Sequence, residues 1–234
     1  MNQQLQDTLT TYANPSWQSN PAMHQLVDGY AKFHAALAGV GAVFVLVFVA
    51  LSIFSWLRFK RVAKTGRFRW PFEKKVYFCF ATVFTFVSLF LALITTANIS
   101  NAVKPLPGFT DSISSITTSD YNRQLHAAFS DWVESGDTTA PRLVQQRVHD
   151  RQMFHLVRFI ISGILLVVFS FLSLRLWKTL LARRATSETG WTLAEAGWLV
   201  AGSAMVVLSL YMVLAFMANF QGVVAPIANA LQFG

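Results

Sequence analysis

Residues 76–97 read VYFCFATVFTFVSLFLALITTA and contain no charged side chain. A helix needs about 20 mostly apolar residues to cross the roughly 30 Å hydrocarbon core of a bilayer. Three other stretches, 33–57, 154–177 and 192–219, are similarly long and apolar. The sequence therefore predicts an all-α, polytopic membrane protein with four transmembrane helices.

The composition of the whole chain agrees with this fold class. Of its 234 residues 54% are apolar and only 13% are charged, whereas about 25% are charged in a typical soluble domain. A soluble fold of this size would need more charge to cover its surface. The missing charge indicates that part of the surface faces lipid.

Basic residues indicate which side each loop faces. Eight lie between 58 and 75 and four between 175 and 184, whereas the long loop 98–153 is close to neutral. Because cytoplasmic loops are enriched in Lys and Arg, both short loops are expected in the cytoplasm. Both termini and the long loop are then extracytoplasmic, and the expected location is a bacterial plasma membrane.

This topology divides the chain into five segments. They are an outer N-terminal segment (1–32), the first two spans with their basic loop (33–97), an outer helical loop domain (98–153), the last two spans with their loop (154–219), and an outer C-terminal segment (220–234). No internal repeat stands out among them. Residues 1–20 are polar, and Pro21 suits the first position of a helix that leads into the first span.

Within the outer segments, Pro105, Pro107 and Gly108 predict an irregular stretch. A helix is expected from Ser119 to about residue 134, and Gly136 ends it. From about residue 141 one long helix should continue through the third span to about residue 184. The apolar C-terminal segment is too short to cross again, so it should lie on the outer surface or dock on the loop helices.

The first candidate site is the basic cytoplasmic segment. Its eight positive side chains are Arg58, Lys60, Arg61, Lys64, Arg67, Arg69, Lys74 and Lys75. Some nucleic-acid binders also mix basic and aromatic residues, but this segment is tethered at both ends to spans. Attraction to anionic lipid headgroups is the better interpretation, and no nucleic-acid partner is expected.

The second candidate site is an apolar stripe on the outer loop helix. Tyr121, Leu125, Phe129 and Trp132 recur at three- and four-residue steps and share one helix face. Something must cover this stripe in water. The cover is either the extension of the third helix or a partner protein, so these residues are a candidate partner-binding surface.

The third candidate site consists of two histidines at the outer ends of spans. His34 begins the first span and His155 the third, with Arg158 one turn further. Two histidines from two helices could ligate a haem or a metal ion. Alternatively they are interfacial groups that face water and headgroups. Glu195, in the first turn of the fourth span, is expected to pair with a nearby arginine.

Motifs of common enzyme classes are missing, and no ionisable residue lies at the middle of a span. Membrane enzymes and ion-coupled transporters usually place ionisable groups there. The preferred hypothesis is therefore a non-enzymatic scaffold or accessory subunit that binds other membrane subunits or itself. Small residues four apart, such as Ala35 and Gly39 or Gly197 and Ala201, would allow close helix approach.

Two alternatives remain open. One is a redox protein that holds a haem or metal through His34 and His155. The other is a small homo-oligomeric channel, whose pore would be lined by the hydroxyl groups of Thr82, Thr85, Ser88, Ser162, Ser170 and Ser173. Serine and threonine are equally at home in lipid-packed helices, where they bond back to their own backbone.

Overall fold

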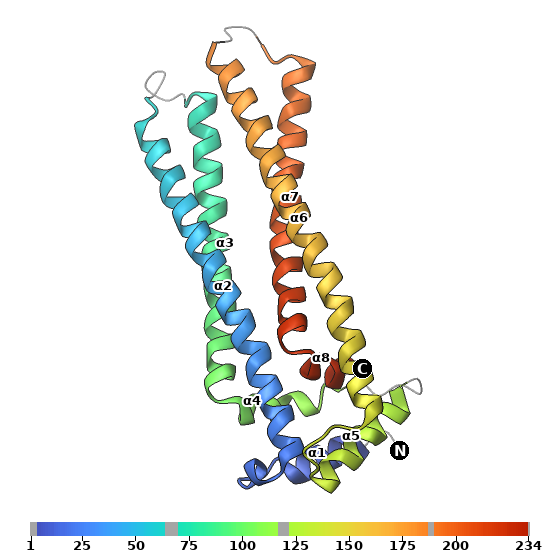
Figure 1. Cartoon of the computed structure of the whole chain (residues 1–234). Helices are drawn as coiled ribbons and strands as arrows, with labels where there is room; N and C mark the ends of the chain where they lie inside the picture. The colour runs from blue at the N-terminus through green and yellow to red at the C-terminus, as the bar shows by residue number, and fades with distance from the viewer. Residues whose placement is uncertain (1–3, 64–69, 117–121, 187–189, 234) are drawn as a thin grey trace. The chain divides into compact units, whose positions relative to one another are not determined.

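The computed structural model describes residues 4–63, 70–116, 122–186 and 190–233. Every regular element in these ranges is a helix, which confirms the all-α fold class (Figure 1). In chain order they are α1 (Gln4–Tyr12), the 3-10 helix η1 (Trp17–Ser19), α2 (Pro21–Arg61), α3 (Phe72–Val103), α4 (Pro105–Ile113), α5 (Arg123–Ser135), α6 (Arg142–Thr186), α7 (Leu193–Val224) and α8 (Pro226–Phe233).

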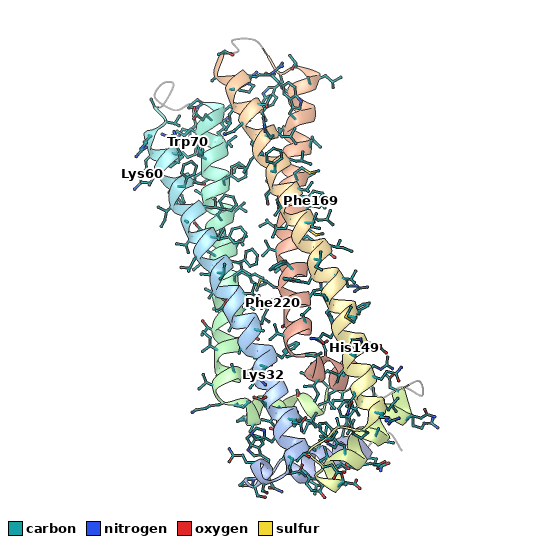
Figure 2. All side chains as sticks on the ribbon, viewed as in Figure 1. Lys32, Lys60, Trp70, His149, Phe169 and Phe220 are labelled. Carbon is teal, nitrogen blue, oxygen red and sulfur yellow. The ribbon has the colours of Figure 1, made fainter. Side chains whose placement is uncertain are left out.

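Four of these helices, α2, α3, α6 and α7, are long and apolar enough to cross a membrane. They contain 41, 32, 45 and 32 residues, and at about 1.5 Å per residue each exceeds the roughly 30 Å hydrocarbon core. Large apolar side chains project outward from them (Figure 2). Among these, four are 68–70% exposed: Leu46, Phe86, Val167 and Val200. Such surfaces are typical of an integral, multi-pass membrane protein.

The chain divides into two compact units. The first, here called the terminal unit, contains Met1–Gly39, Thr95–Phe159 and Met217–Gly234. The second, the hairpin unit, contains Val40–Ile94 and Ile160–Phe216. The N-terminal segment, the long loop and the C-terminal segment therefore belong to one unit, together with one end of each long helix.

Aromatic and hydroxyl side chains join α2 to α3 in the hairpin unit. The rings of Phe48 and Phe84 lie 5.9 Å apart. The hydroxyl oxygens of Ser52 and Thr85 lie 2.7 Å apart, and the Trp56 indole N–H donates to the same threonine at 3.3 Å. Because these contacts recur at four-residue steps along α2, they define the face that α2 presents to α3.

The terminal unit has its own hydrophobic core, built from segments that are far apart in the sequence. Its buried members are Leu5, Leu9, Ala22, Met23, Leu26, Val27, Tyr30, Phe109, Ile113, Ile116, Leu125, Phe129, Trp132, Val133, Val144, Ala230 and Leu231. They come from α1, α4, α5, α8 and the first turns of α2 and α6, together with Ile116 just after α4. This core makes the terminal unit a packed helical body rather than a set of loops.

Hydroxyl and indole groups buried in the terminal unit make hydrogen bonds within it. The hydroxyl oxygens of Thr8 in α1 and Ser130 in α5 lie 2.7 Å apart, and the Trp132 indole N–H donates to the Asp137 carbonyl oxygen at 2.8 Å. Burial lowers the pKa of His126, so this side chain is neutral in the packed core.

Two helices of the terminal unit were not predicted. Residues 4–12, for which the sequence indicated only a polar stretch, form α1, because burial of Leu5 and Leu9 stabilises the helix. The region of Pro105 and Pro107 forms α4 rather than an irregular stretch. Pro105 occupies the first turn, where a missing N–H costs nothing, and Phe109 on the same helix is buried.

Other predictions about helix bounds were confirmed. Gly136 ends α5 in the left-handed conformation, with its N–H on the Trp132 carbonyl oxygen. The long helix α6 begins and ends within two residues of the predicted bounds. The start of α5 was expected at Ser119, which lies outside the described residues. The C-terminal segment forms α8 and contributes Ala230 and Leu231 to the core.

Candidate functional site: two histidine–asparagine pairs

His34 and His155 each pair with an asparagine on the next long helix. The His34 Nδ1 lies 2.6 Å from the Asn98 Oδ1, which joins α2 to α3. The His155 Nδ1 lies 3.0 Å from the Asn219 Oδ1, which joins α6 to α7. Both pairs belong to the terminal unit. Neither asparagine was predicted as a site residue. In both pairs the histidine and the asparagine are 64 residues apart.

Each pair determines which imidazole nitrogen carries the proton. An amide oxygen only accepts hydrogen bonds, so Nδ1–H must donate to it in both pairs. The neutral imidazole then has its lone pair on Nε2. Metal-binding histidines commonly have this arrangement, in which one ring nitrogen donates to an oxygen and the other binds the metal. The geometry is therefore compatible both with ligation through Nε2 and with a purely structural link between helices.

The surroundings of the two rings differ. The His34 ring lies 4.3 Å from the Tyr30 ring, centroid to centroid. The His155 ring packs against the backbone of Gly222, where a Cβ atom would collide with it. The His155 Nε2 is buried and has no hydrogen-bond partner in the described ranges of the chain. Among the described residues there is no group of three or more His, Cys, Asp or Glu side chains that could hold a metal ion.

The apolar stripe of α5 is covered from within the chain. Leu125, Phe129 and Trp132 are 3%, 0% and 1% exposed and belong to the core of the terminal unit. Tyr121, the fourth predicted member, lies outside the described residues. The cover includes α1, which packs on α5 and was neither of the two covers considered. Val144 in the first turn of α6, the extension of the third span, belongs to the same core. The three side chains offer no surface to a partner in this structure.

The basic segment 58–75 is only partly described. Arg58, Lys60, Arg61 and Lys75 are exposed, whereas Lys64, Arg67 and Arg69 lie outside the described residues. Lys74 differs from the prediction because it is buried. Its ammonium group donates to the Val62 carbonyl oxygen at 2.5 Å, just after the end of α2.

Glu195 forms the expected pair with an arginine. One of its carboxylate oxygens lies 3.5 Å from an Arg184 nitrogen. The same oxygen accepts the Thr192 backbone N–H at 3.0 Å, while the Thr192 hydroxyl oxygen accepts the Glu195 N–H at 3.2 Å. This reciprocal arrangement is a capping box, and it gives Glu195 a structural role at the start of α7.

Hydroxyl groups proposed as pore-lining make local bonds. Thr85 donates to the Ala81 carbonyl oxygen at 2.7 Å and Ser88 to the Thr85 carbonyl oxygen at 2.8 Å, both within α3. Such bonds satisfy a hydroxyl inside its own helix. No observation here favours a pore.

The chain was compared with known protein families, proteins and structures. No protein-family model, curated protein or solved structure matches this chain.

Proposed function

We propose that this chain is a non-enzymatic scaffold or accessory subunit of a larger membrane complex. Its candidate chemical groups support a structural role, since each of them already bonds to a neighbour: His34 to Asn98, His155 to Asn219, and Glu195 to Arg184 and Thr192. The terminal unit is a preformed body with an internal core, and a rigid body of this kind suits a subunit that positions other proteins.

The observation that carries the partner-binding proposal is an open face on α2. Ala35 and Gly39 lie four residues apart and are both exposed. Within the part of the chain that the structure describes, no atom would lie within 4 Å of a Cβ atom added at Gly39. Small residues with this spacing let a second helix approach closely in a membrane. The proposed partner therefore packs a transmembrane helix against this face.

Gly39→Leu is the first test of this proposal. The added side chain should reduce co-purification of the partner in mild detergent at least several-fold, because close helix packing depends on the small residue. The amount of protein in the membrane should stay unchanged, since the position is open within the chain. Ala50→Leu adds similar bulk at another exposed position of α2 and serves as the control. If no protein co-purifies with the unaltered chain at a fixed ratio, or if both variants behave alike, the proposal fails.

The proposed orientation places both termini and the terminal unit outside, and the ends of the two helix hairpins in the cytoplasm of a bacterium. Three basic residues lie in the last turn of α2, and two lie in the last turn of α6. Because the cytoplasmic ends of spans are enriched in Lys and Arg, these residues support the proposed orientation.

Cysteine labelling tests the orientation directly. In a Cys79→Ser background, cysteines at Gln18 and Gln146 should react with a membrane-impermeant reagent in intact cells, because both positions are exposed in the terminal unit. Cysteines at Ala63 and Ala185, which are exposed at the far ends of α2 and α6, should react only after the cells are lysed. The reverse pattern would show that the orientation is inverted.

A further inference from the structure

The two halves of the chain have helices at equivalent positions, 121 residues apart. Helices α2 and α6 begin at Pro21 and Arg142. Helices α3 and α7 both contain 32 residues, and each bound of α7 lies 121 residues after that of α3. The same offset relates Pro105 and Pro226, the first residues of α4 and α8. The ends of α2 and α6, Arg61 and Thr186, depart from this offset. Because the first residues of these helices all keep it, the two halves align without a gap.

Residues with specific side chains recur at the same offset. Both halves contain Phe-His at the outer end of the first long helix, Phe-x3-Ser-x3-Trp further along it, and Ala-Asn near the end of the second. Phe-His lies at 33–34 in the first half and 154–155 in the second. Phe-x3-Ser-x3-Trp lies at 48–56 and 169–177, and Ala-Asn at 97–98 and 218–219. Matches at His, Asn and Trp carry more weight than matches among Val and Leu, which are common throughout the spans.

Contacts and exposure are equivalent as well. The two histidine–asparagine hydrogen bonds occupy the same pair of positions in each half. Ser52 and Ser173 are 8% and 9% exposed, while Phe86 and its equivalent Val207 are 69% and 65% exposed. Corresponding faces of the helices are therefore turned inward and outward in both halves.

We infer that the chain consists of two tandem copies of one two-span unit, with the histidine–asparagine pair as a site present in each copy. The first copy extends to α4 and the second begins with α5. A unit with two spans returns to its starting side, so both copies have the same orientation and are parallel repeats. This corrects the expectation that the chain has no internal repeat.

Each copy has the other copy as its packing partner within the chain. Helices α1 and α5 are equivalent elements, and they pack against each other in the terminal unit. A contact between the same element of two copies is the arrangement of a two-fold symmetric dimer. A single two-span unit would need a second chain to form this contact. Here both units that form it belong to the same chain.

One difference between the copies allows a sharp test. In the first copy the Trp56 indole N–H donates to Thr85. In the second, the equivalent Trp177 packs over Gly202, and its indole nitrogen is buried without a hydrogen-bond partner among the residues that the structure describes. The position equivalent to Thr85 is Val206. If the copies are equivalent, a hydroxyl group at position 206 should accept the Trp177 N–H.

The test measures thermal unfolding of the full-length protein in detergent. Val206→Thr should raise the melting temperature by about 2–4 °C, because it gives a buried donor its missing acceptor. Thr85→Val should lower it by at least as much, since it leaves the Trp56 indole unpaired in the first copy and also removes the partner of the Ser52 hydroxyl. Val207→Thr, at the neighbouring exposed position, should not raise it. The inference is overturned if Val206→Thr gives no increase, or if Val207→Thr gives the same increase.

Discussion

Trp132→Ala and Phe129→Ala should each destabilise the terminal unit by about 3–5 kcal/mol, the usual cost of replacing a buried large aromatic by alanine. Both side chains are at most 1% exposed in the core. Trp132 would also lose the hydrogen bond to the Asp137 carbonyl oxygen. Hydrogen exchange should show faster exchange of the α1 and α5 amides, while the apolar stretches of the four long helices stay protected.

Two further variants separate the contributions to this effect. Trp132→Phe keeps most of the buried ring and loses only the hydrogen bond, so it should cost about 1 kcal/mol plus a small packing term. Trp191→Ala removes an aromatic that is 47% exposed in the hairpin unit, and α1 and α5 should not respond. Unchanged exchange in Trp132→Ala would show that the core described here does not stabilise the terminal unit.

The basic segment 58–75 is expected to bind anionic lipid about a thousandfold more tightly than a variant without four of its charges. Near an anionic surface each basic residue contributes about 1 kcal/mol. Replacing Arg61, Lys64, Arg67 and Arg69 by glutamine should therefore remove about 4 kcal/mol of binding free energy. In a peptide of this segment Trp70 is the only tryptophan, so its fluorescence reports partitioning into anionic liposomes.

Two controls distinguish charge from other effects in this experiment. Exchanging arginine and lysine at the same four positions keeps the charge and should change the affinity only a few-fold. Added salt should weaken binding by the unaltered peptide, because it screens surface charges. If the glutamine variant binds as tightly as the unaltered peptide and salt has no effect, the segment is not an anionic-lipid site.

The long helices could be predicted from the sequence because their signal is local. A run of apolar residues without charge specifies a potential span by itself. The bounds of α6 were predicted closely because no glycine or proline interrupts the pattern between Arg142 and Gly163. Burial of Leu5 and Phe109 in a shared core, by contrast, depends on contacts between distant segments. The sequence therefore did not predict α1 and α4.

The candidate site was predicted only in part for the same reason. His34 and His155 were selected as polar groups at the ends of spans, but their partners lie 64 residues away. The equal spacing was a signal that could have identified Asn98 and Asn219. It went unnoticed because identical residues in the two halves are sparse among spans that consist largely of Phe, Leu, Val and Ala.

The composition of the terminal core has a consequence for the order of events during synthesis. Leu5 and Leu231 belong to the same core, so this body cannot be completed until nearly the whole chain has left the ribosome. In the proposed orientation α8 must also be translocated before it can dock. Until then the other members of this core leave part of their apolar surface uncovered. A chain truncated before Pro226 should therefore be a substrate for membrane proteases, even though all four of its long helices are present.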